Sequence, residues 1–256
     1  MNRNFIQNST ATVFQIAVIA LMGVGELRAG ELSDTVLIKS DPIVRGAPPL
    51  NGAVAVGYDT TYMFRGANLG QDAPWTQAVI LAPVGQYTIS AGAWYIDPQH
   101  PAGGRPGTAN DELDLHLSAS RNLSFVNIWV GYTSYLYPEM GRGSTNEVGI
   151  GWSSAINFFD LSFGYFHDFD LDTNYYEYTL GKNIDLNEAI ALNAGLTLGN
   201  YSARNFHGVI SCGLDFELTE SAEITTFAAY NFVDADRPLT GYEGRFFGGV
   251  SLNFSF

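Results

Sequence analysis

The chain ends with the stretch Phe246-Phe247-Gly248-Gly249-Val250-Ser251-Leu252-Asn253-Phe254-Ser255-Phe256. Every second residue back from Phe256 is apolar or Gly, and the residues between them are mostly small or polar. Successive side chains of a β-strand point to opposite faces, so this stretch predicts a strand with one apolar face. The same alternation recurs along most of the chain.

The segments that alternate are about ten residues long, which is the length of transmembrane β-strands. We expect twelve strands, at residues 53–65, 76–83, 86–96, 112–121, 123–136, 146–157, 159–168, 174–183, 189–199, 206–218, 222–233 and 242–256. Connections after odd-numbered strands are mostly long and polar, and those after even-numbered strands are short. Outer-membrane barrels have long external loops and short periplasmic turns. The sequence therefore predicts an all-β fold: an antiparallel, up-and-down transmembrane β-barrel of about twelve strands over residues 53–256.

The first 29 residues differ from the rest of the chain. Arg3 precedes an apolar run at residues 11–24, and Leu27-Arg28-Ala29 fits a cleavage site. This order is typical of a secretory signal peptide, here residues 1–29, and the apolar run is short for a membrane anchor, which is the alternative. Residues 30–52 contain three Pro residues and predict a periplasmic linker or a plug in the barrel mouth. The expected location is the outer membrane of a Gram-negative cell.

Charge and composition exclude several kinds of site. The 256 residues carry a net charge of −14, which becomes −15 without residues 1–29, and this argues against a nucleic-acid partner. Cys212 is the single Cys, so no intrachain disulfide is expected, and its parity points it toward lipid. The stretch 168–174 alternates acidic residues but lacks the Gly and Glu of a calcium loop. We predict no metal site and no cofactor.

The side chains opposite the apolar face are expected to line the lumen. Most are Gly, Ser or Thr, and a barrel of twelve strands lined by them should leave space for water. Bulky inward residues that would narrow this space are Trp94, Trp129, Phe166, Phe227 and Phe247. The candidate pore-lining residues are Asp59, Arg65, Asp114, His116, Glu147, Glu177, Asp215, Glu243 and Arg245. Acidic side chains outnumber basic ones, which favours the passage of cations.

Two basic residues fall near the outer rim on strands that must pair to close the barrel. Arg65 and Arg245 could form a contact for anions, or each could pair with a neighbouring carboxylate such as Glu243. We favour the pairing, because inward charges are usually paired. Arg residues also lie in or beside most outer connections, where they could contact lipopolysaccharide phosphates: Arg65, Arg105, Arg142, Arg204 and Arg237.

Catalysis is the alternative with the weakest support. Asp114, His116 and Ser118 share one strand face, but Cα atoms two residues apart on a strand are about 6.5 Å apart, which is poor for a hydrogen bond between His and Ser. His207, Ser211 and Asp215 are spaced more widely still. We therefore expect no enzyme. A non-conducting barrel for surface structure or adhesion remains the second function class, and an outer-membrane hydrolase the third.

Short motifs add a family resemblance to this reading. A last strand ending in Phe256 resembles the C-terminal strand of bacterial outer-membrane barrels, which implies recognition by the outer-membrane assembly machinery. The motifs that resemble the TorF-type porin family are Tyr62-Met63-Phe64-Arg65-Gly66, Pro74 with Gln77, Gly92-Ala93-Trp94 with Asp97, Glu112-Leu113-Asp114 and Tyr176-Glu177-Tyr178. The resemblance covers residues 53–256 and implies a porin. With the polar inner face, we expect passive diffusion of small hydrophilic solutes through a narrow acidic lumen. The solute and a homo-oligomeric state stay open.

Overall fold

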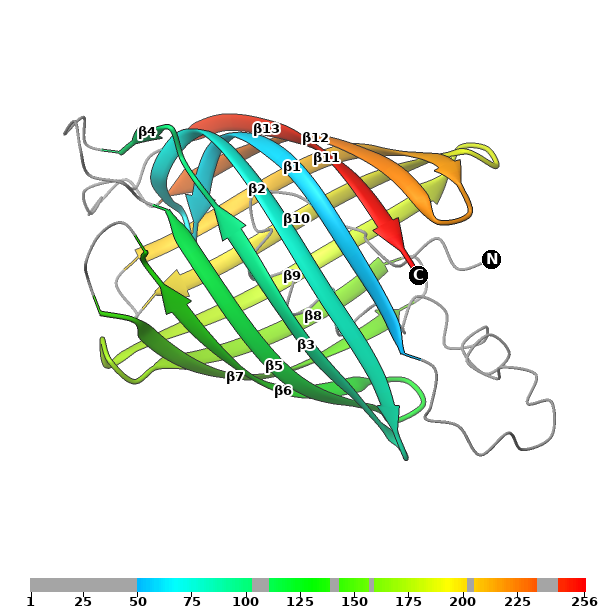
Figure 1. Ribbon diagram of the computed structural model, residues 1–256, viewed down its shortest axis with the longest axis horizontal. Helices are drawn as coiled ribbons and strands as arrows, with labels where there is room; N and C mark the ends of the chain where they lie inside the picture. Colours follow the sequence, from blue (N-terminus) through cyan, green and yellow to red (C-terminus); the bar gives the residue numbers. More distant parts are fainter. Residues whose placement is uncertain (1–49, 103–110, 139–142, 157–158, 202–204, 234–243) are drawn as a thin grey trace.

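A computed structural model describes residues 50–102, 111–138, 143–156, 159–201, 205–233 and 244–256 (Figure 1). The expected signal peptide and nearly all of the expected linker lie outside these residues. The strands are β1 (Asn51–Phe64), β2 (Ala67–Val84), β3 (Tyr87–Ile96), β4 (His100–Pro101), β5 (Glu112–Asn122), β6 (Asn127–Leu136), β7 (Thr145–Ile156), β8 (Phe159–Asp168), β9 (Thr173–Asp185), β10 (Ile190–Tyr201), β11 (Asn205–Thr219), β12 (Ala222–Val233) and β13 (Arg245–Ser255). No helix among the described residues is long and apolar enough to cross a membrane.

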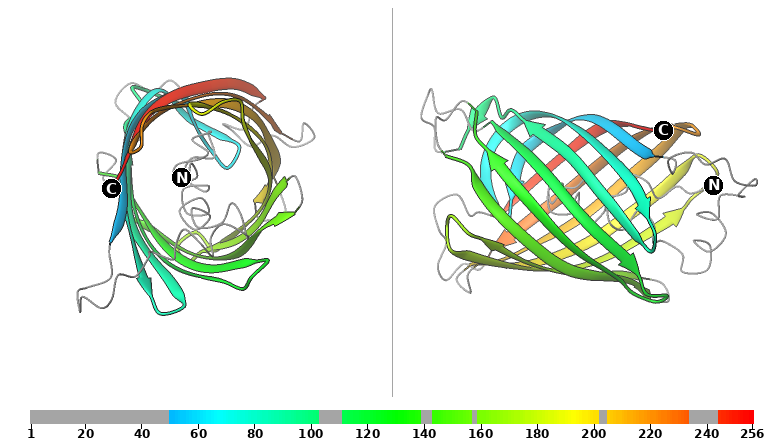
Figure 2. Two further views of the ribbon diagram at one scale, coloured as in Figure 1. Left: turned by 90° about the vertical axis from the view of Figure 1, so that its right-hand side faces the viewer. Right: turned by 60° about the horizontal axis from the view of Figure 1, so that its bottom comes forward.

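Twelve of these strands form a closed antiparallel barrel, as the alternation predicted. Each strand pairs with the next along the chain, and β1 pairs with β13 to close the ring. Figure 2 shows this ring end-on and the tilt of its strands from the side. The two-residue strand β4 pairs only with the outer end of β2 and is not part of the wall. Two backbone hydrogen bonds between Gly52 and Phe256 extend the closing seam to the last residue of the chain.

The predicted strand positions agree with the structure, with one important exception. The strands at 159–168 and 222–233 have the bounds that were expected, and most others differ by a few residues. The predicted outer connection at residues 66–75 is wrong, because β2 begins at Ala67 and follows β1 after a two-residue turn. The predicted start of the fifth strand is also early, since residues 123–126 form a turn before β6.

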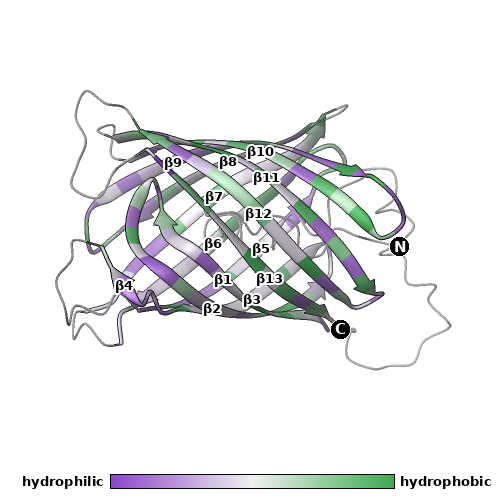
Figure 3. Cartoon of the chain, turned by 90° about the horizontal axis from the view of Figure 1, so that it is seen from above, coloured by the Kyte–Doolittle hydropathy of each residue, from purple (hydrophilic) through white to green (hydrophobic). Residues whose placement is uncertain are grey.

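Apolar side chains cover the outside of the barrel. Val56, Leu117 and Ile150 are each more than half exposed, although all three lie in mid-strand. Hydrophobic and hydrophilic residues alternate along the strands, as Figure 3 shows. This pattern fits a wall with lipid outside and polar groups inside. Cys212 is exposed, in agreement with its predicted outward direction.

Bulky side chains lie over several of the inward glycines. A Cβ added at Gly92 would lie 2.4 Å from the imidazole of His116, and one at Gly57 would lie 2.3 Å from the indole of Trp75. A Cβ at Gly151 would lie 2.6 Å from the indole of Trp129. The expectation that these small residues leave open space is therefore wrong at these positions, because neighbouring rings occupy the room that the missing side chains provide.

Candidate functional site

The outer halves of β1 and β2 leave the barrel wall and bend into the lumen. β1 pairs with β13 only from Ala53 to Asp59, and β2 pairs with β3 only from Trp75 onward. Between these points, the two strands continue to pair with each other up to Phe64 and Ala67, and β2 also meets the short β4. Figure 2 shows this part inside the ring of strands. We call residues 60–74 the inner hairpin.

A tight turn forms the tip of the inner hairpin. Arg65 has a φ of 49° and Gly66 a φ of 83°, and Phe64 pairs with Ala67 on either side of them. A two-residue turn with both central residues at positive φ is the type that matches the twist of a β-hairpin. Gly takes this conformation without strain, whereas Arg65 needs compensation from its surroundings. The contacts of the Arg65 side chain provide that compensation.

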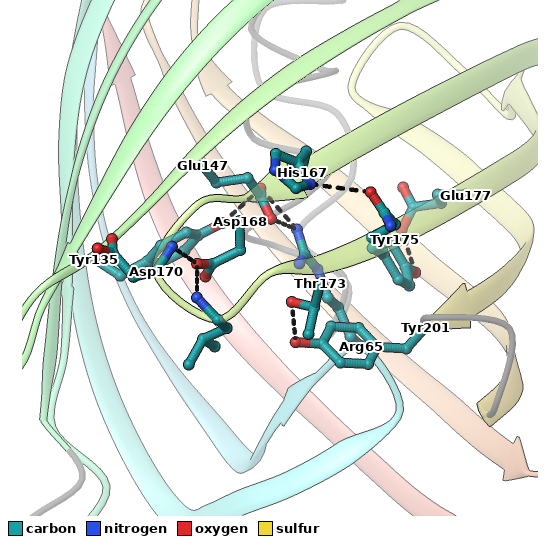
Figure 4. Close-up of polar contacts among 12 residues, drawn as sticks. Arg65, Tyr135, Glu147, His167, Asp168, Asp170, Thr173, Tyr175, Glu177 and Tyr201 are labelled. Carbon is teal, nitrogen blue, oxygen red and sulfur yellow. Dashed lines mark hydrogen bonds and ion pairs between the residues drawn. The ribbon is translucent and has the colours of Figure 1, made fainter.

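Arg65 forms a buried ion pair with Glu147 on β7, a strand on another side of the ring. Its Nη2 atom lies 2.7 Å from Oε1 and 2.6 Å from Oε2 of the carboxylate. The side chains are 5% and 3% exposed, so water hardly screens the pair. The Tyr135 hydroxyl donates a second hydrogen bond, of 3.0 Å, to Glu147 Oε1. The pair therefore fastens the hairpin tip across the lumen (Figure 4).

Aromatic rings surround the guanidinium of Arg65. Its Cζ atom lies 4.4 Å from the ring centroid of Tyr175, 5.0 Å from that of Phe64 and 5.3 Å from that of Phe166. A cation over an aromatic face is attracted by the ring quadrupole, more strongly where water is excluded. Arg is charged at every physiological pH, and the carboxylate of Glu147 together with these rings offsets the cost of burying that charge.

The backbone of the tip is held on a third side of the lumen. Asn231 on β12 donates a hydrogen bond of 3.1 Å from Nδ2 to the carbonyl oxygen of Gly66. Gly66 also packs against His207 on β11, since an added Cβ would lie 2.6 Å from that side chain. The His207 ring stacks on Tyr175, and the Tyr175 hydroxyl contacts His207 Nε2 at 3.0 Å while donating to Glu177 at 2.9 Å. The tip thus touches side chains of β7, β8, β9, β11 and β12.

Two apolar clusters hold the flanks of the inner hairpin. Met63 packs with residues of β11, β12 and β13, namely Val209, Phe227, Ala229 and Phe247. Tyr62, Ala73 and Trp75 pack on the other side with residues of β3 and β6, namely Trp94, Ile96 and Tyr135. Burial of a large apolar side chain contributes about 1.5–3 kcal/mol. The hairpin is therefore packed into the outer half of the lumen and does not lie there as a loose loop.

Three further carboxylates lie near the tip. Glu112, Asp114 and Glu177 are 4%, 0% and 0% exposed. Glu112 accepts a hydrogen bond of 2.7 Å from the Tyr62 hydroxyl, and Arg65 interacts electrostatically with all three. One guanidinium therefore lies among four carboxylates when Glu147 is included. Among the described residues, no group of three His, Cys, Asp or Glu side chains is arranged to hold a metal ion.

A separate polar network lies nearer the periplasmic end. Asp215 on β11 accepts hydrogen bonds from Thr225, at 3.0 Å, and from Asn193. Asn183 donates to Asn193 at 2.6 Å, and Asn253 donates to Thr225 at 3.1 Å. The network links strands β9 to β13 and makes no contact with the inner hairpin among the interactions described. Its carboxylate, Asp215, therefore belongs to the lumen wall and not to the surroundings of the hairpin tip.

The structure brings together only some of the residues predicted to line a pore. Arg65, Glu147, Glu177 and Asp114 lie around the hairpin tip, and Asp59 lies below it, accepting a hydrogen bond of 3.2 Å from Trp75 Nε1. His116 and Asp215 are buried on the wall, away from the tip. Arg245 is the first residue of β13 and pairs with Asn231 of β12. Glu243 lies outside the described residues. The carboxylate that the structure shows paired with Arg65 is Glu147 on β7, across the lumen.

Sequence reasoning missed Tyr135, Tyr175 and His207 as partners of the tip. Alternation gives the face on which a side chain lies, but it does not give what lies opposite that side chain across the lumen. The signal that could have found the hairpin is Arg65-Gly66 itself. A Gly in a two-residue break between two alternating segments indicates a tight hairpin.

No protein-family model and no curated protein matches the chain. Solved structures match in fold. An outer-membrane channel from Pseudomonas putida F1 is 10% identical with a TM-score of 0.53, over 82% of this chain and 96% of that one. The KdgM porin is 8% identical with a TM-score of 0.50, over 80% of this chain and 99% of the porin. The chain thus has the fold of outer-membrane channel proteins. Its membership of the TorF-type family stays a prediction.

The expectation that the chain is not an enzyme needs correction. The channel and the porin named above are only 10% and 8% identical to the chain, so they establish its fold and do not establish whether it has an activity. Similarity at this level concerns the fold, and one fold serves many functions. The fold therefore does not exclude catalysis. Neither ring nitrogen of His116 has a hydrogen-bond partner among the described residues, so the Asp114, His116 and Ser118 set is not joined as a triad.

Proposed function

We propose that the chain is an outer-membrane channel through which small hydrophilic solutes diffuse passively, with a preference for cations. The observation that carries this proposal is the closed wall of twelve strands with an apolar exterior and charged groups inside. Polar walls favour water over lipid, and an excess of carboxylates lowers the energy of a cation relative to an anion. The fold that the chain shares with the Pseudomonas putida channel and the KdgM porin supports the same function.

The proposal includes export and partners. Residues 1–29 would direct the chain out of the cytoplasm and be removed, and the strand that ends in Phe256 would be recognised by the assembly machinery. Lipid would cover the apolar wall. Contact of outer Arg residues with lipopolysaccharide is part of the proposal for Arg105, Arg142, Arg204 and Arg237, which lie outside the described residues. Arg65 is not available for such a contact, because it is 6% exposed and paired with Glu147.

A second candidate is a non-conducting barrel that serves surface structure or adhesion. The inner hairpin favours it, because its tip is fastened to several strands and its flanks are packed with apolar side chains. Conductance of the refolded chain in a planar bilayer separates the two candidates. Discrete current steps, with a reversal potential in a salt gradient that has the sign of cation preference, are expected for a channel. Silence from folded protein would reject the channel.

A further inference from the structure

We propose that the barrel wall carries a binding site for guanidinium groups and that the chain's own Arg65 occupies it. The residues that form this site are Tyr135, Glu147, Phe166 and Tyr175. A solute that ends in a guanidinium group competes with the tip of the inner hairpin for the site, so that binding of one releases the other. The inference goes beyond the proposed function, because binding at this site does not require the barrel to conduct.

The site is built by wall residues of four successive strands, β6 to β9. Phe166 and Tyr175 lie opposite each other on β8 and β9, with ring centroids 6.0 Å apart, and Phe166 also packs on Trp129 at 5.6 Å. The Tyr135 hydroxyl donates a hydrogen bond of 3.0 Å to Oε1 of Glu147. None of these contacts involves the hairpin. The carboxylate and the rings are therefore oriented by the wall itself, as a preorganised site requires.

The site matches the shape and charge of a guanidinium group. This group is planar, donates hydrogen bonds from its edge and stacks on aromatic faces, whereas an ammonium group is compact and more strongly hydrated. Arg65 uses both features, since Nη2 lies 2.7 and 2.6 Å from the two oxygens of Glu147 and Cζ lies 4.4 Å from the ring centroid of Tyr175 (Figure 4). The chemical class that fits is therefore small alkylguanidinium solutes, in preference to alkylammonium solutes.

The hairpin turn itself does not call for an arginine. Residue 65 has a φ of 49°, a conformation in which Gly, Asn and Asp are favoured and a long side chain is strained. The strain is accepted where it places the guanidinium group in the site. The tip can also leave without opening the ring, because the pairing of β1 with β13 ends at Asp59 and that of β2 with β3 begins at Trp75. The hairpin is thus placed to exchange with a solute.

Arg65→Gly empties the site and keeps the turn, because Gly adopts positive φ without strain. The probe is methylguanidinium. N-methylurea has nearly the same shape without the charge, and methylammonium has the charge without the planar group. Saturation-transfer NMR on the refolded variant should show saturable binding of methylguanidinium, about tenfold tighter than that of either control. Adding Glu147→Gln to this variant should weaken the binding by about the same factor.

Competition is tested in the protein that keeps Arg65. A thiol introduced by Met63→Cys, with Cys212 replaced by Ser, reacts with a water-soluble maleimide when the hairpin leaves its packed position. Methylguanidinium should accelerate this labelling, doubling the rate when its concentration equals the dissociation constant of the open site. In the Arg65→Gly background, the same solute should slow the labelling, because it gives Glu147 a partner beneath the closed hairpin. A general effect of salt or denaturant would change both rates in one direction.

The outcomes decide between a binding site and a structural ion pair. Rate changes of opposite sign, with binding that depends on Glu147, support the inference. Binding that does not distinguish methylguanidinium from methylammonium overturns it, as does acceleration in both backgrounds. Labelling of the protein that keeps Arg65 tests the site even where Arg65→Gly fails to fold. A silent barrel that binds methylguanidinium would reject the channel and leave the site, and a conducting barrel that binds none would do the reverse.

Discussion

Replacing Glu147 by Leu should release the inner hairpin from the far side of the lumen. The substitution removes the partner of Arg65 and the acceptor of the Tyr135 hydrogen bond together. Removing one partner of a buried ion pair costs about 3–5 kcal/mol, because the other charge stays buried without compensation. The Asn231 hydrogen bond to Gly66, at about 1 kcal/mol, and the contacts between the Arg65 guanidinium and aromatic rings, at about 1–2 kcal/mol, remain.

The free energy of opening the hairpin should therefore fall by about 3 kcal/mol. Because about 1.4 kcal/mol changes an equilibrium constant tenfold, the fraction of molecules with an open hairpin should rise roughly 100-fold. Glu147→Gln keeps an oxygen acceptor for Arg65 and loses the charge. Hydrogen bonds to charged groups exceed neutral ones by about 1 kcal/mol, so this variant should open roughly five times as often as the parent.

A buried thiol reports the opening. Met63 lies on the flank of the hairpin and is 4% exposed, so Met63→Cys places a thiol that reacts only when the hairpin moves out of its packed position in the lumen. The native Cys212 is exposed and is first replaced by Ser. When opening and closing are fast, the rate of labelling by a water-soluble maleimide is proportional to the open fraction. The expected order of rates is parent, then Glu147→Gln, then Glu147→Leu.

Two results would refute this reasoning. Equal labelling rates in the parent and in Glu147→Leu would mean that the ion pair does not hold the hairpin. A rate increase with Asp215→Asn as large as that with Glu147→Leu would mean that any lost lumen carboxylate loosens the barrel. An increase confined to the Glu147 variants is the result that the structure predicts.

Three further changes have expected outcomes. Gly249→Val should lower the free energy of unfolding in detergent by about 1–3 kcal/mol through overpacking, since an added Cβ would lie 2.7 Å from the Tyr58 carbonyl oxygen. Gly181→Ala should leave the free energy of unfolding unchanged, because the nearest atom to its added Cβ is 4.0 Å away. Tyr175→Phe should cost about 1–3 kcal/mol in the same measurement, because Glu177 and His207 lose their hydroxyl partner; a neutral result would show that water replaces it. Phe256→Ala should reduce the folded protein recovered from outer membranes but not its stability after refolding in vitro, and equal recovery would remove the proposed role of the last residue in assembly.

The barrel could be predicted from the sequence because its information is local. Each strand carries its own alternation, and the difference between long and short connections repeats along the chain. The alternation also fixes the side on which a residue such as Glu147 or Val56 lies. These features need no knowledge of distant contacts, so the predicted strands agree with the structure apart from the starts of β2 and β6.

The inner hairpin could not be predicted in the same way. Strand alternation is identical whether a pair of strands stays in the wall or bends away from it, and the Asn, Gly, Gln and Asp residues between 67 and 75 were interpreted as a loop. The contact that fixes the hairpin joins Arg65 to a residue 82 positions away, across the lumen. Its existence depends on the curvature of the closed ring and on which strands face one another, and neither is encoded in a short segment.

The early departure of β1 from the wall also shortens the joint that closes the barrel. The register of β1 with β13 covers seven residue pairs, from Ala53 to Asp59, while β10 and β11 are matched over twelve. Above this joint, the amide of Gly248 bonds to the Thr60 hydroxyl in place of a strand neighbour. A closed sheet that is heated or pulled loses its shortest strand pairing first. We therefore expect this barrel to begin unfolding by the separation of β1 from β13.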